Sequence, residues 1–325
     1  MQLQVVRREM QRLAPGEGRL NLAIIICTNS RYSLLEKAIA SALMQGDSAD
    51  EIIVVDNSPD RDKAENFSRA YSGLARLRFA FEEIQNLSHA RNIGTALAQT
   101  DIVAFMDDDA VAEPNWAKAL IEAFATGGAD VGCVGGPVKP IWMSEPPTWL
   151  TPALAGYLSI LDLGDEKKEL SRGDWLAGCN IAFNRQALLS IGGFRTDIGR
   201  TGNKLCLLSN EETAAWQKLK RAGKKVLYSP DAIVSHHINE GRVNSQWLSR
   251  RIAWQAVSDV ISDPELASQV ADSGAAFVTA RMLFSVAVRL LGRRYPHPLS
   301  DGEANALYRL VVVLLSRGIE SFFSK

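Results

Sequence analysis

The chain has 325 residues, of which 46% are hydrophobic and 22% are charged, as in ordinary globular proteins. Its formal net charge of -1 excludes a globally basic nucleic-acid-binding protein, and we expect no nucleic-acid partner. The four cysteines lie far apart without a Cys-x-x-Cys pair, which indicates reduced cytosolic thiols instead of a zinc cluster or disulfide framework. No apolar signal segment opens the chain, and no stretch approaches the roughly 20 apolar residues of a membrane span. We therefore expect a cytoplasmic protein.

From residue 21 to residue 109 the sequence alternates between strands and helices. Short apolar or β-branched runs predict strands at Leu22–Cys27, Glu51–Val55, Leu77–Phe81 and Ile102–Met106. Helical patterns lie between them at Ser33–Gln45, Asp60–Tyr71 and Ser88–Gln99, the last with Ser88 as its candidate N-cap. This order predicts a mixed, mainly parallel α/β sheet flanked by helices, in which ligands bind at the carboxyl ends of the strands.

The second half of the chain begins with a proline-rich connection. Residues 136–152 hold five of the twelve prolines, which predicts a long loop over the sheet edge that either shapes a pocket or packs on the domain. Strands are then expected at Trp175–Phe183, Lys225–Leu227 and Ala232–Ser235, and helices at Arg185–Ile191, at Asn210–Ala222 and from Ser245 onwards. The chain divides into an N-terminal extension (1–20), a catalytic domain (21–244) and a helical C-terminal region (245–325).

Three consecutive carboxylates, Asp107, Asp108 and Asp109, follow the apolar strand Ile102–Met106. Like charges this close repel one another, and a hard divalent cation such as Mg²⁺ or Mn²⁺ relieves the repulsion by binding their oxygens. A solvated acidic turn is the alternative for an Asp triplet. The first strand ends in Thr28-Asn29-Ser30-Arg31, without the glycines of a dinucleotide fold or a P-loop, which disfavours an NAD enzyme or a P-loop NTPase.

Further polar segments follow in a characteristic order. They are Asp56 after the second strand, Asn86-Leu-Ser-His-Ala-Arg91-Asn92-Ile-Gly94, Gly178-Cys-Asn180, Glu211-Glu212 at a helix start and His236-His237. Together with the Asp triplet, and over residues 21–240, this set resembles family-2 glycosyltransferases. That resemblance implies a GT-A (Rossmann-like) fold and inverting transfer of a sugar from a nucleoside diphosphate. The segments around Pro146-Pro147 and Gly156-Tyr157-Leu158 resemble bacterial enzymes that assemble exopolysaccharide or other cell-envelope glycans.

The resemblance implies a donor site built from several separate segments. It places Thr28, Asn29 and Arg31 around the base and ribose, and gives Asp56 the hydrogen bond from the base, commonly uracil N3–H. An Asx-turn is the alternative for Asp56. The remaining donor-site residues are Arg91 facing the nucleotide, Asp107 near ribose or sugar hydroxyls, Asp108 beside it, and Gly178 and Asn180 lining the sugar pocket. Arg200, in the loop before the acidic pair, is a candidate for contact with the diphosphate.

The resemblance also implies a metal site and a general base. Asp109 and His236 would bind Mn²⁺ or Mg²⁺ with Asp107 as a further ligand, and His237 is the alternative histidine, since strand alternation turns only one towards the site. Glu212 would be the base that deprotonates the acceptor hydroxyl, with Glu211 binding or orienting the acceptor. The choice between the two glutamates stays open because the family usually has Glu-Asp here, and acidic residues also suit a helix N-terminus.

The C-terminal third has an apolar, partly basic character. Arg281, Ser285, Arg289 and Arg293 recur every four residues along an apolar helix, and Ala306–Phe323 is comparably apolar. Either residues 275–323 lie on the inner face of the cell membrane, with the arginines on anionic lipid, or they pack on the catalytic domain or on a second subunit. The segment Arg250-Arg251-Ile-Ala-Trp254-Gln255 is weakly similar to the Gln-x-x-Arg-Trp region of processive relatives, but the order differs and processivity is not predicted.

The sequence thus predicts a hexosyltransferase that moves a sugar from a nucleoside-diphosphate sugar, most simply a UDP-sugar, to a glycan or lipid-linked acceptor. A sugar-phosphate nucleotidyltransferase is the alternative enzyme, and it would carry a glycine-rich loop where Thr28–Arg31 stands. The non-enzymatic alternative is a catalytically inert protein that binds glycans or serves as an assembly scaffold. Intact Asp109 and an intact acidic pair argue against it.

Overall fold

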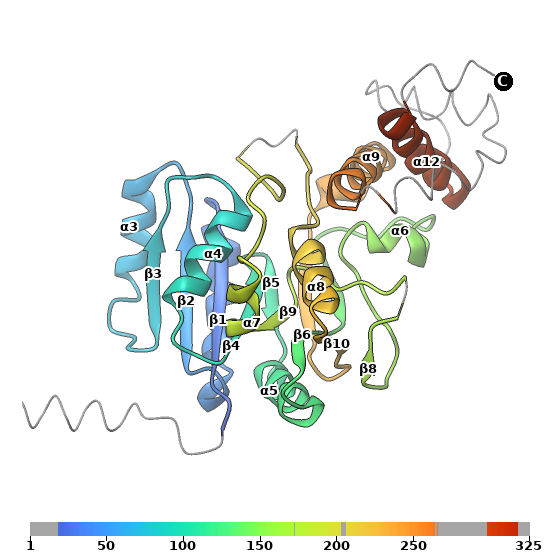
Figure 1. The fold of residues 1–325 in the computed structure, drawn as a ribbon. Helices are drawn as coiled ribbons and strands as arrows, with labels where there is room; N and C mark the ends of the chain where they lie inside the picture. Colours follow the sequence, from blue (N-terminus) through green and yellow to red (C-terminus); the bar gives the residue numbers. More distant parts are fainter. Residues whose placement is uncertain (1–18, 172, 203–205, 264, 266–297, 318–325) are drawn as a thin grey trace, which may run out of the picture.

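The computed structural model describes residues 19–171, 173–202, 206–263, 265 and 298–317. Its centre is an eight-stranded sheet (Figure 1). In spatial order the strands are β3 (Leu77–Phe81), β2 (Glu51–Asp56), β1 (Leu22–Thr28), β4 (Ile102–Asp107), β9 (Ile181–Asn184), β6 (Val131–Gly135), β10 (Lys225–Tyr228) and β8 (Lys168–Glu169). A second sheet holds β5 (Ala110–Ala112), β11 (Val234–Ile238) and β7 (Val138–Trp142) in that order.

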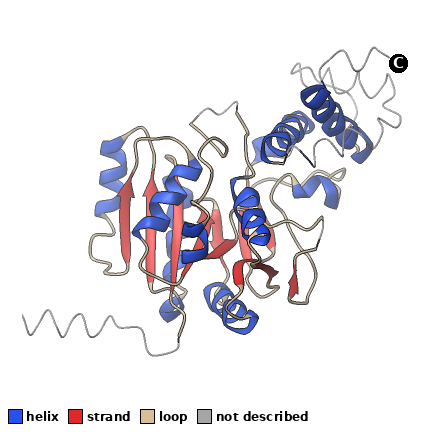
Figure 2. Ribbon diagram, in the orientation of Figure 1, coloured by secondary structure: helices blue, strands red, loops and turns tan. Residues whose placement is uncertain are grey.

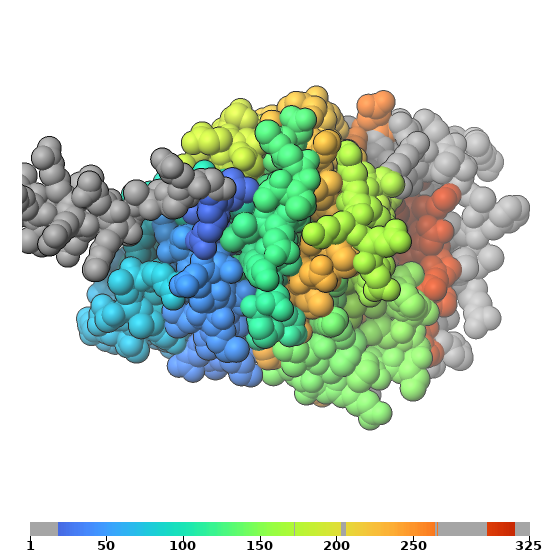
Figure 3. Space-filling view, turned by 90° about the horizontal axis from the view of Figure 1, so that it is seen from below, coloured from blue at the N-terminus to red at the C-terminus, as the bar shows by residue number. Residues whose placement is uncertain are grey.

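Helices surround these sheets, as the colouring by secondary structure shows (Figure 2). They are α2 (Tyr32–Leu43), α3 (Arg61–Arg69), α4 (Leu87–Leu97), α5 (Trp116–Gly127), α6 (Pro152–Gly156), α7 (Arg185–Ser190), α8 (Glu211–Arg221), α9 (Ser245–Ser262) and α12 (Asp301–Arg317). Short 3₁₀ turns form η1 (Gly46–Ser48) and η2 (Glu240–Arg242). Seen from below, α5 crosses the middle of the molecule (Figure 3). Within the described part of the chain, no helix combines the length and the apolar character needed to cross a bilayer.

The strands β3, β2, β1 and β4 run parallel to one another. All seven residues of β1 are buried, as expected of a strand covered on both faces by helices. In the register of the sheet Thr28 pairs with Asp56, and Cys27 pairs with Asp107. The carboxyl ends of three strands therefore meet at one edge, and the predicted α/β fold with its mainly parallel sheet is confirmed.

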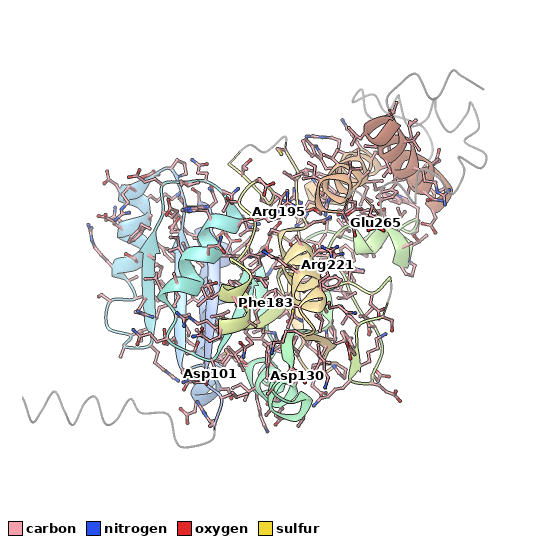
Figure 4. The ribbon with its side chains drawn as sticks, viewed as in Figure 1. Asp101, Asp130, Phe183, Arg195, Arg221 and Glu265 are labelled. Carbon is pink, nitrogen blue, oxygen red and sulfur yellow. The ribbon has the colours of Figure 1, made fainter. Side chains whose placement is uncertain are left out.

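The sheet becomes mixed beyond β4, because β9 pairs antiparallel with both β4 and β6. Three aromatic rings hold this part of the core together. Phe105 on β4, Phe183 on β9 and Phe194 after α7 make edge-to-face contacts, with ring centroids 5.1 to 6.1 Å apart. Phe183 lies near the middle of the domain in Figure 4. These contacts fix β9 and the loop that follows α7 against the parallel half of the sheet.

The proline-rich segment differs from the predicted loop. Val138–Trp142 forms β7, which runs parallel to β11 in the second sheet. Pro140 has no N–H to donate to a neighbouring strand, and the sheet accommodates it because β7 is an edge strand. The high proline content therefore predicted a loop where residues 138–142 form a strand.

Other differences concern where elements begin and end. Of the expected strand Trp175–Phe183, only the stretch from Ile181 is extended in β9. Ser88 is not the N-cap of α4: the Asn86 side chain accepts the cap hydrogen bond from the His89 N–H at 2.9 Å, and the Ser88 hydroxyl donates to the Ile198 carbonyl at 2.8 Å. The strand expected at Ala232–Ser235 continues through both histidines.

The described C-terminal helices, α9 and α12, lie together at the upper right of Figure 1, beside α6. A separate apolar cluster joins them, and its buried members are Leu154, Leu158, Ile238, Leu248, Ile252, Leu299, Ala304 and Leu307. The predicted stripe of Arg281, Ser285, Arg289 and Arg293 lies outside the described residues, so the membrane and subunit alternatives stay predictions. The predicted domain boundaries at residues 20 and 244 also stay predictions.

Candidate active site

The acidic turn between β4 and β5 lies at the edge where the parallel strands end, and its three carboxylates face different partners. The Asp107 carboxylate faces Arg91, Asp108 faces Thr28 and Arg31, and Asp109 faces His236 and Arg31. Asp108 and Asp109 are almost completely buried, while 29% of the Asp107 side chain is exposed. The turn is therefore built into the domain and is not a solvated acidic turn.

Asp108 ties the acidic turn to the loop after β1. The Thr28 hydroxyl donates to Asp108 Oδ2 at 2.6 Å, and Arg31 Nε donates to the same oxygen at 3.1 Å. Burial raises the pKa of Asp108 to about 7, although the charge of Arg31 opposes the shift. Thr28 and Arg31 are thus brought to the Asp triplet, as a shared donor site requires.

Asp109 and His236 form a buried pair. Asp109 Oδ1 lies 3.3 Å from His236 Nε2, and Arg31 makes an ion pair with the other carboxylate oxygen. Burial alone would raise the pKa of Asp109, but His236, Arg31 and Arg242 hold it well below its usual range. The Asp109 carboxylate is consequently ionised, as a ligand to a cation must be.

His237 points away from this pair. Its Nδ1 lies 3.1 Å from the backbone oxygen of Asp109, and its Nε2 lies 3.4 Å from Lys37 Nζ. Burial lowers the pKa of His237. Adjacent strand residues face opposite sides, and of the two histidines His236 is the one that faces the Asp109 carboxylate.

The Asp109–His236 pair has the chemistry to hold a divalent cation. Asp109 Oδ1 is buried and has no hydrogen-bond partner among the described residues, and the His236 nitrogen that faces it is Nε2. One carboxylate and one imidazole suit Mn²⁺, and substrate phosphates commonly complete such a shell. Within the described ranges, no group of three or more His, Cys, Asp and Glu side chains is arranged for a metal. Asp107, expected as a third ligand, instead faces Arg91.

Arg91 connects the acidic turn to the start of α8. Its buried guanidinium donates to Glu211 Oε1 at 2.8 Å, to Asp107 Oδ1 at 3.2 Å and to the Gly178 carbonyl at 3.0 Å. These partners come from three segments that are distant in the sequence. The Arg91 guanidinium is thus engaged by three protein groups, and its expected place facing the nucleotide stays a prediction.

The two glutamates at the start of α8 have different environments. Glu211 is paired with Arg91, whereas Glu212 Oε2 lies 4.0 Å from Arg91 Nη1 and has no hydrogen-bond partner among the described residues. Burial, followed by the charge of Glu211, raises the pKa of Glu212 to about 8 against the opposing charge of Arg91. The Glu212 side chain is still 16% exposed. An unpaired carboxylate of raised proton affinity is suited to general-base catalysis.

Asp56 and Asn29 occupy the ends of β2 and β1. Asp56 Oδ1 accepts a hydrogen bond from the Ser58 N–H at 2.9 Å, which forms the Asx-turn that was the alternative for this residue. The other oxygen of Asp56 accepts from the Tyr32 hydroxyl at 3.0 Å. Asn29 Nδ2 donates to the Asn57 carbonyl at 3.2 Å. Both side chains lie beside Thr28, at the edge where the sequence placed the nucleotide.

Gly178 and Asn180 differ in their surroundings. A Cβ atom on Gly178 would come within 2.9 Å of Arg91 Nη2 and 3.2 Å of Glu212 Cδ, so Gly178 lies against the acidic pair. Asn180 is fully buried. Its amide accepts from Trp116 Nε1 at 2.7 Å and donates to the carbonyls of Pro137 and Ala232 at 2.8 and 2.7 Å. Asn180 therefore joins three segments below the site and does not line a sugar pocket.

Three further arginines, Arg200, Arg242 and Arg251, have charges that act on the site, and little or nothing in the sequence indicated them. Arg242 Nη1 lies 4.0 Å from Asp109 Oδ2. Arg251 donates to Ser209 Oγ at 3.2 Å and to Gln255 Oε1 at 2.7 Å. Burial, followed by the charge of Arg242, lowers the pKa of Arg200 against the opposing charges of Glu211 and Glu212. Arg200 was a candidate from the sequence, and Arg251 lies in the segment that is weakly similar to the Gln-x-x-Arg-Trp region, whereas no motif marks Arg242.

Comparisons with known proteins show the family and the fold of the chain. The sequence model of the family described as glycosyl transferase family 2 matches residues 23–188. A glucosyl-dolichyl phosphate glucuronosyltransferase from Haloferax volcanii is 29% identical, over 83% of this chain and 86% of its own. The succinoglycan biosynthesis protein ExoM from Rhizobium meliloti is 27% identical, over 71% and 72%. The solved mannosyltransferase from Pyrobaculum calidifontis, in complex with GDP-Man and Mn²⁺, aligns with a TM-score of 0.53 and 18% identity, over 97% of this chain and 93% of that chain.

Proposed function

This chain belongs to glycosyltransferase family 2, and from that premise we propose an inverting, metal-dependent enzyme that transfers a sugar from a nucleoside diphosphate to a glycan or lipid-linked acceptor. The observation that carries the proposal is the bridge made by Arg91. One guanidinium contacts both Asp107 and Glu211, at 3.2 and 2.8 Å. The carboxylates expected to serve the donor and the acceptor therefore lie within one site.

Asp109 and His236 would hold Mn²⁺ or Mg²⁺ in this enzyme. The cation would supply positive charge to the diphosphate leaving group. Glu212 accepts the proton of the acceptor hydroxyl as its oxygen forms a bond to the anomeric carbon, while the bond from that carbon to the diphosphate oxygen breaks. Attack on the face opposite the leaving group inverts the anomeric configuration. Glu211, held by Arg91, binds or orients the acceptor.

The donor nucleotide is proposed to lie along the ends of β1 and β2. Thr28, Asn29 and Arg31 follow β1, and Asp56 ends β2 with its carboxylate buried. A base N–H donating to Asp56 would suit uridine, and we propose a UDP-sugar as donor. The Pyrobaculum mannosyltransferase was solved with GDP-Man, so guanosine diphosphate is the comparison that a binding experiment needs.

The acceptor is proposed from the relatives. The Haloferax enzyme is named for a glucosyl-dolichyl phosphate, and the Rhizobium protein for succinoglycan biosynthesis. One name gives a lipid-linked sugar and the other a polysaccharide. We therefore propose a growing glycan or a lipid-linked sugar as the acceptor, in the synthesis of an exopolysaccharide or another envelope glycan.

A panel of nucleotide sugars tests this function. With Mn²⁺ present, we expect one donor to be hydrolysed slowly without acceptor, and the released sugar to show an inverted anomeric configuration by ¹H NMR at early times. The chelator EDTA should abolish the reaction. Hydrolysis that is equally fast with EDTA, or a retained configuration, would contradict the proposal.

A further inference from the structure

Asn210, the residue before the acidic pair, has a conformation that is unusual for the start of a helix. It is the N-cap of α8, with φ 79° and ψ 13° in the left-handed region, and its side chain makes no cap hydrogen bond. An asparagine at an N-cap usually accepts such a bond from the second or third N–H of its helix, and residues other than glycine are disfavoured at positive φ. Contacts from outside α8 must therefore hold Asn210 in place.

Helix α9 supplies these contacts. Asn210 Nδ2 donates to Asp259 Oδ1 at 2.6 Å, and Gln255 Nε2 donates to Asn210 Oδ1 at 2.9 Å. Gln255 Nε2 also donates to Asp259 Oδ1 at 2.8 Å, while Gln255 Oε1 accepts from Arg251 Nη2 at 2.7 Å. Both the oxygen and the nitrogen of the Asn210 amide are thus engaged by α9, which lies above α8 in Figure 1.

The backbone beside Asn210 and the helix α12 belong to the same network. The Ser209 N–H donates to Ser258 Oγ at 3.1 Å. From α12, the Tyr308 hydroxyl donates to Asp259 Oδ2 at 2.7 Å. Burial, followed by the charge of Asp259, raises the pKa of Tyr308, so this hydroxyl keeps its proton at neutral pH. Asp259 therefore joins α9, α12 and the residue that begins α8 through hydrogen bonds.

The position of Glu212 depends on the helix turn that Asn210 begins. Glu212 Oε2 is buried without a hydrogen-bond partner among the described residues, so no such bond fixes this oxygen. Glu211 is held separately, since its carboxylate accepts from Arg91 at 2.8 Å. The Asn210 carbonyl accepts from the Ala214 N–H at 2.8 Å and closes the first turn, in which Glu212 is the second residue. A change in the direction of this turn would move the Glu212 side chain.

We propose that Asp259 is a positioning residue for the transfer reaction: it holds Asn210, and so directs the first turn of α8 and places the Glu212 carboxylate at the acceptor hydroxyl. This inference rests on the proposed function, in which Glu212 is the base. The C-terminal helices α9 and α12 then contribute to catalysis by placing a group that lies outside them.

Steady-state kinetics of Asp259→Ala in the full chain test the inference. A displacement of about 1 Å in a reacting group can lower the rate about a hundredfold, so we expect kcat to fall by roughly ten- to a hundredfold. The KM for the donor, and the affinity for Mn²⁺ with nucleoside diphosphate, should stay within about twofold of the wild type, because the donor side is unchanged. Asp259→Asn keeps an oxygen for Asn210 and a polar group for Tyr308, and should lose less activity than Asp259→Ala.

A double-mutant cycle tests whether Asp259 acts through Asn210. Asn210→Gly keeps the positive φ accessible and removes the side chain that α9 holds, so it should itself lower kcat. In the Asn210→Gly background, Asp259→Ala should lower kcat by less than about twofold, since effects of residues in one network are not additive. A full additional loss would show that Asp259 acts by another route and would overturn the inference.

Two control variants separate positioning from a general loss of stability. Asp263→Ala is the matched control, because this carboxylate ends α9 and lies 3.9 Å from Arg221, the last residue of α8. Ile102→Val removes a methyl group at the buried amino end of β4, away from the edge that carries the site. It should lower the melting temperature. Both controls should keep the wild-type kcat.

Hydrogen–deuterium exchange gives a readout that needs no activity. The Ala214 amide and the amides that follow it in α8 should exchange faster in Asp259→Ala, by roughly tenfold or more, and at the wild-type rate in Asp263→Ala. Wild-type exchange or wild-type kcat in Asp259→Ala would overturn the inference, as would a loss of nucleotide affinity as large as the loss of kcat. If no nucleotide sugar supports transfer by the wild type, the proposed function fails, and faster exchange would still show that Asp259 holds the start of α8.

Discussion

Replacing Glu212 with glutamine separates catalysis from stability, because the two should change in opposite directions. The variant keeps the shape of the side chain and removes its ability to accept a proton. Loss of a general base lowers rates by about 10²- to 10⁴-fold. We therefore expect Glu212→Gln to lose at least about a hundredfold in transfer rate, measured with the nucleotide sugar that the donor panel identifies.

The stability change follows from the raised pKa. Burial and the charge of Glu211 raise the pKa of Glu212 from 4.5 to about 8, so between these pH values the folded chain holds a proton that the unfolded chain has released. The free energy of unfolding contributed by this group then falls as pH rises through that window. One pKa unit corresponds to about 1.4 kcal/mol. At pH 8.5 the wild type should be less stable than Glu212→Gln, by up to about 4 kcal/mol.

Urea unfolding at pH 5 and at pH 8.5 measures this difference. The two proteins should have similar stability at pH 5 and should diverge at pH 8.5, with the variant more stable. Glu211→Gln is the matched comparison and should be destabilised at both pH values, because the buried guanidinium of Arg91 loses the negative charge of the carboxylate to which it donates at 2.8 Å. A Glu212→Gln protein that transfers sugar within tenfold of the wild-type rate, or that is less stable at pH 8.5, would refute the reasoning.

Three further predictions concern the neighbours of Glu212. Asp109→Asn should abolish the rise in melting temperature that Mn²⁺ with nucleoside diphosphate gives the wild type; an undiminished shift in a thermal scan would contradict the metal assignment. Arg91→Met leaves the buried Glu211 and the partly exposed Asp107 without their shared partner and should reduce the free energy of unfolding by about 3–5 kcal/mol in urea, whereas a loss below about 1 kcal/mol would mean that the bridge is not formed. Gly178→Ala places a Cβ 2.9 Å from Arg91 Nη2 and 3.2 Å from Glu212 Cδ. The new methyl group should displace these side chains, so that the transfer rate falls clearly while the melting temperature changes little. An unchanged transfer rate would contradict this prediction.

The first half of the fold was readable from the sequence because its strands are continuous apolar runs. β1, β2, β3 and β4 lie where these runs predict them, and each is followed by the polar residues that parallel register then brings together. Of the second sheet, β11 was expected from the run Ala232–Ser235, whereas β7 was not predicted. β7 contains Pro140, a residue that disfavours strands, and only its edge position in the sheet makes it acceptable.

The site residues show the same division. The positions of Asp109, His236 and Glu212 next to charged partners follow from motifs at strand and helix ends. The bridge from Arg91 to Glu211 was not predictable, because it spans 120 residues and depends on how α8 packs against the sheet. Asn180 looked like a pocket residue by its motif, yet its three hydrogen bonds lie within the protein. A motif gives the residue type and its approximate place, while tertiary packing decides what the side chain contacts.

The most direct test of the account is pulsed electron paramagnetic resonance of Mn²⁺ bound to the protein with a nucleoside diphosphate. Asp109 Oδ1 and His236 Nε2 are 3.3 Å apart. We therefore predict that the spectrum shows a nitrogen coupling to the Mn²⁺ from the His236 imidazole. The coupling should disappear in His236→Gln and persist in His237→Gln. A Mn²⁺ complex without nitrogen coupling in the wild type, or one that loses it only in His237→Gln, would contradict the site on which the proposed transfer depends.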